Sequence, residues 1–323
     1  MRSLSGVQPS GKLHIANYLG AIRQFIELQD STDGFYFIAN LHALTTISDS
    51  EMARQYAYDV ALDFLALGLD PERSVLFMQS DIPQIPELAW YLSCVTSMGL
   101  LQRCHAYKDK VARGQTPNHG LFAYPVLMAA DILAFDSDIV PVGEDQRQHV
   151  EVTRDIAVAF NNAYGETLKV PEAKILKSRA SICGTDGQKM SKSYGNTIDI
   201  FAPKGKLKKM VMGIVTDSKG LEEPKDAETN NVFNIYRHLA SEEEAQQMKQ
   251  KLEAGGYGYG HAKKELLNKI HEVFGEAREK REKLVNDMDY VDSVLAQGAK
   301  TAREAAHKVL EKVRQAAGIP KRK

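Results

Sequence analysis

The sequence predicts an α/β protein in which a parallel sheet covered by helices precedes a helical second domain. In the first half of the chain, short apolar segments alternate with stretches whose apolar residues recur at helical spacing. Such alternation of strand and helix is typical of parallel sheets with helices on their faces. After about residue 195 the strand signals fade, and charged stretches with helical periodicity take over. A length of 323 residues also suits two domains better than a single core.

Four strands are expected in the first half, each a short and mostly apolar segment close to turn residues. They span residues 2–6, 35–40, 74–80 and 138–142. The segments between them have apolar residues at helical spacing. The expected helices run from about residue 14 to 26 and over 52–67, 86–101 and 146–159. Ligands of parallel sheets bind beyond the carboxyl ends of the strands, so a site is expected in the loops that follow them.

The boundary between the two domains is expected after residue 195. The first domain then spans residues 1–195 and the helical domain residues 196–323, with a last helix that is able to pack back on the first domain. The glycine-rich segment 255–260 is expected to be a loop. Residues 261–323 contain 15 Lys or Arg and 10 Asp or Glu. This excess of positive charge fits either a solvated helix surface with a basic tail or a surface that faces RNA.

The composition indicates a globular protein of a reducing compartment. Hydrophobic residues make up 43% and charged residues 26%, and with a net charge of −1 a nucleic-acid partner would need a local basic patch. Cys94, Cys104 and Cys183 lack the spacing of a zinc site and are expected to be free thiols. No apolar run reaches the roughly 18 residues of a membrane span, and no signal peptide is visible. We therefore expect a cytoplasmic protein with no membrane contact and no metal held by the protein.

The loop Pro9–Asn17 joins the first expected strand to a helix. A strand–loop–helix junction presents unpaired backbone N–H groups and the positive end of a helix dipole, which favours phosphate. His14 and Asn17 are three residues apart, so they share a helix face and can reach the same ligand. Taken alone, the segment fits a simple turn with a helix cap equally well.

A second loop, Lys189–Ser193, combines two lysines with flanking glycines at 184, 187 and 195. The glycines suggest mobility, and the lysines place positive charges where a triphosphate needs neutralising. An ordinary polar surface loop is the alternative. From average residue frequencies, the pentapeptide is expected by chance in about one chain in ten thousand of this length. Because the pentapeptide is so rare by chance, it strongly favours a loop that binds phosphate over an ordinary surface loop.

The two loops together resemble the HIGH and KMSKS signatures of the class I aminoacyl-tRNA synthetases. The segments 5–25, 124–133 and 141–157 resemble the tryptophanyl members of that family in particular, and the resemblance covers nearly the whole chain. It implies a Rossmann-like catalytic domain, a helical domain that binds the tRNA anticodon, and ATP as substrate together with Mg²⁺. It also implies L-tryptophan and tRNA(Trp) as partners and a homodimer. The apolar helix 86–101 is the candidate dimer interface, with a buried core helix as the alternative.

Ala16 departs from the first signature, where the family has glycine. In the family that glycine lets the adenine ring lie against the backbone, so the extra methyl group is expected to shift adenine and weaken ATP binding. The implied catalytic residues are His14, Asn17, Lys189 and Lys192. The implied ATP-binding residues are Gln8, Pro9, Ser10, Ala16, Asn17, Gly143, Glu144, Asp145, Ile182, Lys189, Met190, Ser191, Lys192 and Ser193.

Asp131 lies in a very apolar segment, where an unpaired carboxylate is costly to bury. It should therefore have a partner, and the resemblance implies the indole N–H of tryptophan, a donor that suits an acceptor-only carboxylate. Tyr124 and Met128 share a helix face with Asp131, although plain core packing is the alternative for both. The resemblance implies that the ring packs against Leu4, His42, Tyr124, Met128, Val140 and Val142, and that Gln146 binds the α-ammonium group.

The implied reaction has two steps. Tryptophan and ATP form tryptophanyl-adenylate and pyrophosphate, and the tryptophanyl group then passes to the 2′-OH of tRNA(Trp). Lys189 and Lys192 would neutralise pyrophosphate, while His14 and Asn17 would bind phosphate oxygens. Two alternatives stay open: a tyrosyl-tRNA synthetase, which shares both signatures, and a catalytically weakened paralogue that binds RNA or a partner, which only Ala16 favours.

Overall fold

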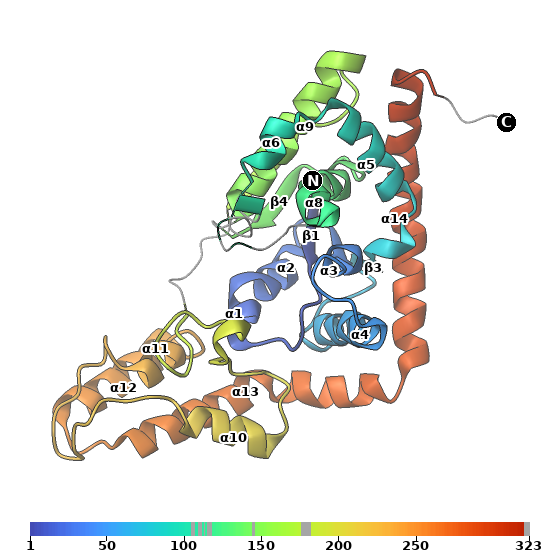
Figure 1. Ribbon diagram of the computed structural model, residues 1–323. Helices are drawn as coiled ribbons and strands as arrows, with labels where there is room; N and C mark the ends of the chain where they lie inside the picture. Colours follow the sequence, from blue (N-terminus) through green and yellow to red (C-terminus); the bar gives the residue numbers. More distant parts are fainter. Residues whose placement is uncertain are drawn as a thin grey trace. The chain divides into compact units, whose positions relative to one another are not determined.

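The chain forms two compact units that are interleaved along the sequence (Figure 1). The computed structural model describes residues 1–104, 107–108, 112, 114, 118–143, 146–175 and 182–319. The first unit comprises Met1–Gly11, Gln24–Lys177 and Leu284–Lys323, and the second comprises Lys12–Arg23 and Ser178–Lys283. This division does not follow the boundary suggested at residue 195, because His14 and the lysine loop both belong to the second unit.

The first unit is built on a five-stranded parallel sheet with the strand order β3-β2-β1-β4-β5. The strands are β1 (Arg2–Val7), β2 (Asp33–Ile38), β3 (Ser74–Met78), β4 (Ile139–Val142) and β5 (Glu172–Ile175). Every neighbouring pair is parallel, so the predicted α/β fold class is confirmed. The strand order reverses between β1 and β4, and a ligand crevice is expected beyond the carboxyl ends of these two strands.

Helices of the first unit pack on this sheet and on each other. They are α2 (Arg23–Leu28), α3 (Asn40–Ala43), α4 (Ser50–Ala66), α5 (Gln84–Val95), α6 (Met98–Gln102), α8 (His119–Leu133), α9 (Arg147–Tyr164) and α14 (Met288–Ala316). The helix predicted over 86–101 is in fact two helices, α5 and α6. The reason is local, because Ser97 caps α6 by accepting a hydrogen bond from the Leu100 N–H at 3.2 Å. A shared core of buried apolar side chains joins the sheet to α5, α8, α9 and α14.

The last helix, α14, runs along strand β3 and past α5 within the first unit (Figure 1). Its residue Gly298 approaches the strand so closely that a Cβ atom there would lie 1.8 Å from the Leu76 carbonyl oxygen. Near the end of the helix, Arg314 donates two hydrogen bonds to the Glu87 carboxylate of α5, at 2.7 and 2.5 Å. The helix is therefore attached to the sheet unit at both its middle and its end.

The second unit is helical in its described part, where the only β-structure consists of two isolated bridges. Its elements are α1 (Ile15–Asn17), the π-helical turn η1 (Tyr18–Ile22), the 3₁₀ turn η4 (Lys192–Tyr194), α10 (Lys204–Met212), α11 (Asn231–Tyr236), α12 (Glu242–Ala254) and α13 (Tyr259–Val285). Met248, Leu252, Leu266 and Phe274 are among its buried apolar side chains. The loop predicted over 255–260 is two residues shorter than expected, since α13 begins at Tyr259.

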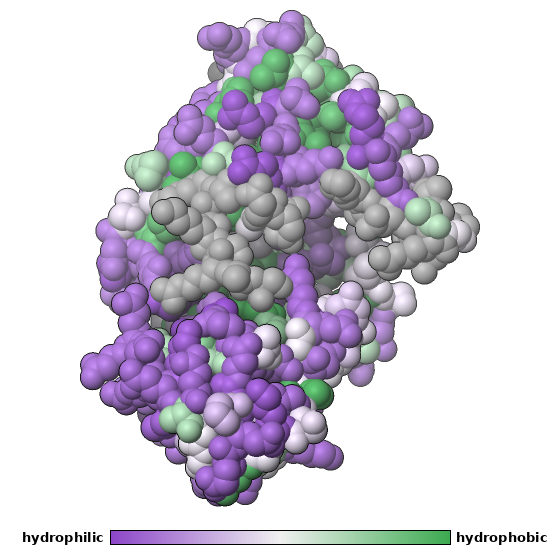
Figure 2. Space-filling view, turned by 90° about the vertical axis from the view of Figure 1, so that its left-hand side faces the viewer, coloured by the Kyte–Doolittle hydropathy of each residue, from purple (hydrophilic) through white to green (hydrophobic). Residues whose placement is uncertain are grey.

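Large side chains with apolar character are exposed in both units, and Tyr194 and Val215 of the second unit are 62% and 55% exposed. In Figure 2 the exposed side chains of the helical second unit are mostly hydrophilic. In the first unit, α5 and α6 carry two large exposed apolar side chains, Trp90 at 70% and Met98 at 63% exposure. Over the described ranges, no helix is both long enough and apolar enough to cross a membrane.

Candidate active site

The loop that carries His14 is hydrogen-bonded to the segment just after the lysine loop, although the two are far apart in the sequence. His14 forms an isolated antiparallel bridge with Asp199, just beyond the lysine loop. The Ile15 N–H donates to the Ile198 carbonyl at 3.1 Å, and the Ile200 N–H donates to the Leu13 carbonyl at 3.2 Å. The segment that follows Lys189–Ser193 is therefore attached directly to the segment that carries His14.

His14 is a buried and neutral imidazole at neutral pH. Burial is the main cause that lowers its pKa to about 4, and the positive charge of Lys192 adds to the effect. Its Nδ1 atom is buried without a hydrogen-bond partner in the part of the chain that the structure describes. Asn17 accepts a hydrogen bond from the His14 backbone N–H at 3.3 Å, at the start of α1, and its proposed contact with phosphate stays a prediction. His14 thus combines a lowered pKa with one unsatisfied ring atom.

Backbone hydrogen bonds connect the lysine loop to the segment before it and close a turn within that segment. The Met190 N–H donates to the Ile182 carbonyl at 2.9 Å, and the Gly184 N–H donates to the Gln188 carbonyl at 2.7 Å. Met190 is buried, whereas Lys189 and Lys192 are exposed. The loop is therefore anchored by an apolar side chain and presents its two lysines at the surface of the unit.

Asn196 supports the lysine loop from inside, and sequence reasoning missed it. Its side chain is buried and accepts a hydrogen bond from the Ser191 N–H at 2.8 Å. The amide nitrogen donates to Asp186 at 2.7 Å and to the Lys189 carbonyl at 3.1 Å. In the sequence, Asn196 is only a polar residue shortly after Lys189–Ser193, which is a weak sign of a supporting role.

Asp131 of α8 has the partner that its burial required. The carboxylate is completely buried, and His42 Nε2 lies 2.8 Å from its Oδ2 atom. Gln79 Nε2 donates to both carboxylate oxygens, at 2.7 and 2.9 Å. Burial raises the pKa of Asp131, while the hydrogen bonds from His42 and Gln79 act in the opposite direction. Gln79 was not predicted, because a single polar residue after a strand is common in proteins.

Tyr124 also lies close to His42, on the same helix as Asp131. The Tyr124 and His42 rings meet edge to face, with 6.2 Å between their centres. The Tyr124 hydroxyl is 2.7 Å from His149 Nε2 on α9, a further residue that sequence reasoning missed. Burial is the main cause that raises the pKa of Tyr124 to about 12. The first unit therefore brings together three of the predicted tryptophan residues, His42, Tyr124 and Asp131.

The remaining predicted site residues divide between the two units. Leu4, Val140 and Val142 are buried in strands β1 and β4, and Met128 is partly buried against the same core. Gln8, Pro9, Ser10 and Gly143 follow β1 and β4, where the strand order reverses, and Gln146 is exposed at the start of α9. Ala16, Ile182, Ser191 and Ser193 belong to the second unit. Glu144 and Asp145 lie outside the described residues, so their roles stay predictions.

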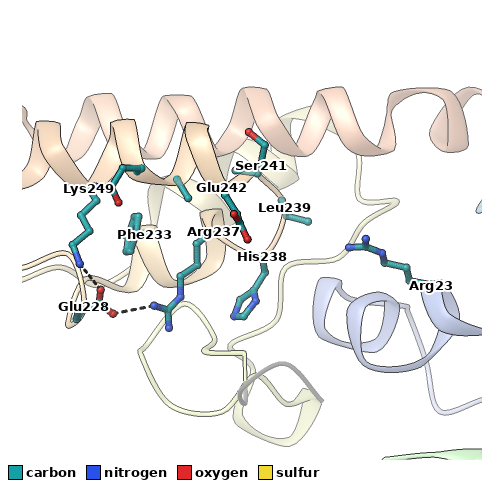
Figure 3. A pocket seen from close by; sticks show the side chains of 12 residues that line it. Arg23, Glu228, Phe233, Arg237, His238, Leu239, Ser241, Glu242 and Lys249 are labelled. Atoms are coloured by element: carbon teal, nitrogen blue, oxygen red, sulfur yellow. Dashed lines mark hydrogen bonds and ion pairs between the residues drawn. The ribbon is translucent and has the colours of Figure 1, made fainter. Parts of the chain in front are cut away.

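A separate groove of about 860 Å³ lies within the second unit, beside α11 and α12. Figure 3 shows Glu228 between Arg237 and Lys249, with His238 and Arg23 along the same groove. The Glu228 carboxylate is 3.0 Å from Arg237 and 2.8 Å from Lys249. Among the described residues of the whole chain, no group of three His, Cys, Asp or Glu side chains is arranged to hold a metal ion.

The sequence matches one protein family and is similar to known members of it. Residues 1–275 match the model of the family described as tRNA synthetases class I (W and Y). A tryptophan–tRNA ligase from Fusobacterium nucleatum is 56% identical over 319 residues, which cover 98% of each chain. A tryptophan–tRNA ligase from Rhodopirellula baltica is 54% identical, over 99% of this chain and 100% of the relative.

A solved structure is similar over the same length. The tryptophanyl-tRNA synthetase from Campylobacter jejuni, determined in complex with ADP and tryptophan, superimposes with a TM-score of 0.93. The two sequences are 49% identical, and the match covers 98% of this chain and 100% of the other. Similarity of sequence and similarity of fold therefore point to the same family.

Proposed function

The chain belongs to the class I tRNA synthetases for tryptophan and tyrosine and is a tryptophan–tRNA ligase. We propose a role for its residues in the first step of the reaction. In this proposal Asp131 of the first unit selects tryptophan, while His14 and the lysine loop of the second unit act on ATP. The tyrosyl alternative and the weakened paralogue are both set aside, because relatives with more than half of their residues identical are tryptophan–tRNA ligases.

The buried, hydrogen-bonded carboxylate of Asp131 is the observation that carries the assignment of tryptophan selection. An ionised carboxylate accepts hydrogen bonds only, and the indole N–H is a donor only, so the two match. Smaller amino acids would lose contact area with the apolar residues around the ring. Tyrosine would place its hydroxyl where the geometry of the polar group does not match. We propose that Leu4, Met128, Val140 and Val142 supply that apolar contact.

Residues of the second unit are proposed to bind and neutralise the phosphates of ATP. A neutral His14 can donate one hydrogen bond to a phosphate oxygen, and the lack of a partner for its Nδ1 atom among the described residues supports this role. Lys189 and Lys192 supply the positive charge, which matters most as pyrophosphate leaves. ATP would enter with Mg²⁺, which prefers oxygen ligands such as phosphate and water. Gln8, Ser10, Gly143, Glu144 and Asp145 are also proposed as ATP-binding residues.

The proposed chemistry requires no nucleophile from the protein. The tryptophan carboxylate attacks the α-phosphorus, the bond to the bridging oxygen breaks, and pyrophosphate leaves with that oxygen. Catalysis then consists of positioning and charge stabilisation. In the second step the 2′-OH of the terminal adenosine of tRNA attacks the carbonyl carbon of the adenylate, and AMP leaves.

The tRNA and a second copy of the chain are the proposed macromolecular partners. The helical second unit would receive the anticodon, and the basic residues beside its groove support a phosphate contact. Trp90 and Met98, both exposed, are proposed to contact the partner subunit, since large apolar side chains act as anchors in interfaces. The three cysteines are free thiols, which is consistent with the cytoplasm as the proposed location.

Pyrophosphate exchange into ATP, measured with tryptophan and with tyrosine, tests the proposal. We expect exchange with tryptophan and none with tyrosine at equal concentration. Asp131→Asn should lower kcat/KM for tryptophan about 100-fold and should leave the KM for ATP unchanged. The amide keeps only one oxygen, which Gln79 and His42 would occupy, so that its NH₂ group would face the indole N–H. An unchanged kcat/KM in this variant would contradict the role of Asp131. Absence of exchange with tryptophan in the wild type would contradict the reaction itself.

A further inference from the structure

We propose that Gln79 is a positioning residue that sets the selectivity for an indole N–H, by holding the Asp131 carboxylate with one acceptor position open. The inference rests on the role proposed above for Asp131. Gln79 follows strand β3 directly, begins the 3₁₀ turn η2 (Gln79–Asp81), and is completely buried. A buried amide needs partners for both of its ends, and the identity of those partners indicates what the residue does.

The contacts of Gln79 determine which end of its amide faces Asp131. Its Oε1 atom accepts hydrogen bonds from the Leu41 N–H at 3.0 Å and the His42 N–H at 3.4 Å, at the start of α3. Two backbone donors require an oxygen there, so the NH₂ group must point the other way, toward Asp131. The reverse orientation would place the amide oxygen against a carboxylate and the NH₂ group against two N–H donors.

The hydrogen bonds to Asp131 leave one acceptor position available. A carboxylate has about four lone-pair sites, two on each oxygen. Oδ2 receives Gln79 Nε2 at 2.9 Å and lies 2.8 Å from His42 Nε2. Among the described residues, Oδ1 has the Gln79 contact alone, at 2.7 Å. Oδ1 can therefore take one more donor, which matches the single N–H of an indole.

Gln79 also helps to keep Asp131 an acceptor. Burial raises the pKa of Asp131, and the donors from His42 and Gln79 lower it. Without the amide donor, the carboxyl group takes a proton more readily and rotates more freely. A carboxylic acid can donate a hydrogen bond as well as accept one, so the requirement for an N–H in the substrate weakens. Loss of Gln79 is therefore expected to change the choice of substrate as well as the rate.

A purely structural role for Gln79 makes a different prediction. The residue connects β3, α3 and α8 through its contacts with Leu41, His42 and Asp131, and a merely structural residue would affect all amino-acid substrates alike. The ratio of kcat/KM for tryptophan to kcat/KM for a benzothienyl-alanine separates the two roles. This analogue has the shape of tryptophan, with sulfur in place of the N–H group. We call this ratio the N–H selectivity.

The experiment measures N–H selectivity by pyrophosphate exchange in the full chain. We expect a value of about 100 or more in the wild type, because a buried acceptor left unpaired penalises the analogue. Gln79→Met should lower the N–H selectivity at least tenfold and leave the KM for ATP unchanged. Gln79→Glu keeps an oxygen for the Leu41 and His42 N–H groups but sets a second carboxyl group beside Asp131, so it should lower the selectivity as well. Gln84→Met, a matched substitution at the start of α5, should leave it unchanged, because no hydrogen bond joins Gln84 to Asp131 among the described residues.

The possible results separate the inference from the function on which it rests. If both Gln79 variants lose activity equally on the two substrates, the role is structural and the inference is overturned. The same conclusion follows if N–H selectivity falls in Asp131→Asn but not in the Gln79 variants. If the wild type activates tryptophan but shows an N–H selectivity near one, the role of Asp131 is wrong and the inference fails with it. Thermal unfolding of each variant shows whether it is folded.

Discussion

His14 is held neutral beside a cation, and this has a measurable consequence for stability. Burial first, and then the charge of Lys192, lower its pKa from 6.5 to about 4. Between these pH values the folded chain binds fewer protons at this site than the unfolded chain does. The stability that comes from a neutral His14 is therefore present above about pH 6.5 and is lost as the pH falls toward about 4. From pH 7 to pH 5, the unfolding free energy of the wild type should fall by about 2 kcal/mol more than that of His14→Gln.

Urea unfolding of the wild type and of His14→Gln at both pH values measures this difference. A ¹⁵N NMR titration of the His14 ring supplies a second measurement, and the ring should still be neutral at about pH 5. The comparison with His14→Gln removes the contribution of other titrating groups. A ring that takes up its proton near its ordinary pKa, or an equal loss of stability in the two proteins, would contradict the prediction.

Elements with strong apolar periodicity could be predicted from the sequence, and those governed by local polar contacts could not. Strands β2 and β3 contain continuous apolar runs, which mark strands buried on both faces. Strand β5 was missed because its sequence, EAKI, has only two apolar residues. The break between α5 and α6 was missed because a capping serine stands within an apolar stretch and periodicity continues on both sides.

The contact between α14 and β3 depends on the absence of a side chain at Gly298. An added Cβ atom would lie 1.8 Å from the Leu76 carbonyl oxygen and 2.7 Å from its carbonyl carbon, and a strand backbone cannot move away easily. Alanine is favoured over glycine within helices by about 1 kcal/mol, but the clash is larger. We expect Gly298→Ala to lower the free energy of unfolding by about 2 kcal/mol or more.

Gly275→Ala in α13 is the matched control, since a Cβ atom there would meet nothing within 4 Å. This variant should be slightly stabilised, by at most about 1 kcal/mol, through helix propensity. Urea unfolding followed by circular dichroism gives the midpoint for each variant. The prediction for Gly298 fails if its midpoint matches or exceeds that of the wild type.

At the scale of the whole molecule, the sequence indicates which residue types belong to the site but not how they meet. The two loops and Asp131 were identifiable because phosphate chemistry and a buried carboxylate each restrict the residues that serve them. The hydrogen bonds between residues 13–15 and 198–200 depend on the three-dimensional course of the chain, so no local pattern reveals them. Gln79 and His149 likewise become visible only as partners of Asp131 and Tyr124. The effect of Ala16 on adenine stays a prediction.

The charge balance of the chain restricts where tRNA can bind. With a net charge of −1, the protein has no general attraction for a polyanion, so phosphate contacts need a local group of cations. The groove of the second unit offers one, in which Arg237 and Lys249 flank Glu228 (Figure 3). We expect replacement of both cations by alanine to raise the KM for tRNA about tenfold and to flatten its salt dependence, because each lost cation removes a phosphate contact.

Pyrophosphate exchange needs no tRNA, so it should be unchanged in the double variant if the groove serves tRNA alone. Glu228→Gln is the matched control, because it removes the acidic partner and leaves both cations in place. It should leave the KM for tRNA unchanged or lower it, whereas a rise would mean that the ion pairs position the groove. An unchanged KM for tRNA in the double variant would show that these ion pairs do not contact tRNA. A loss of exchange activity would instead connect the groove with the handling of ATP.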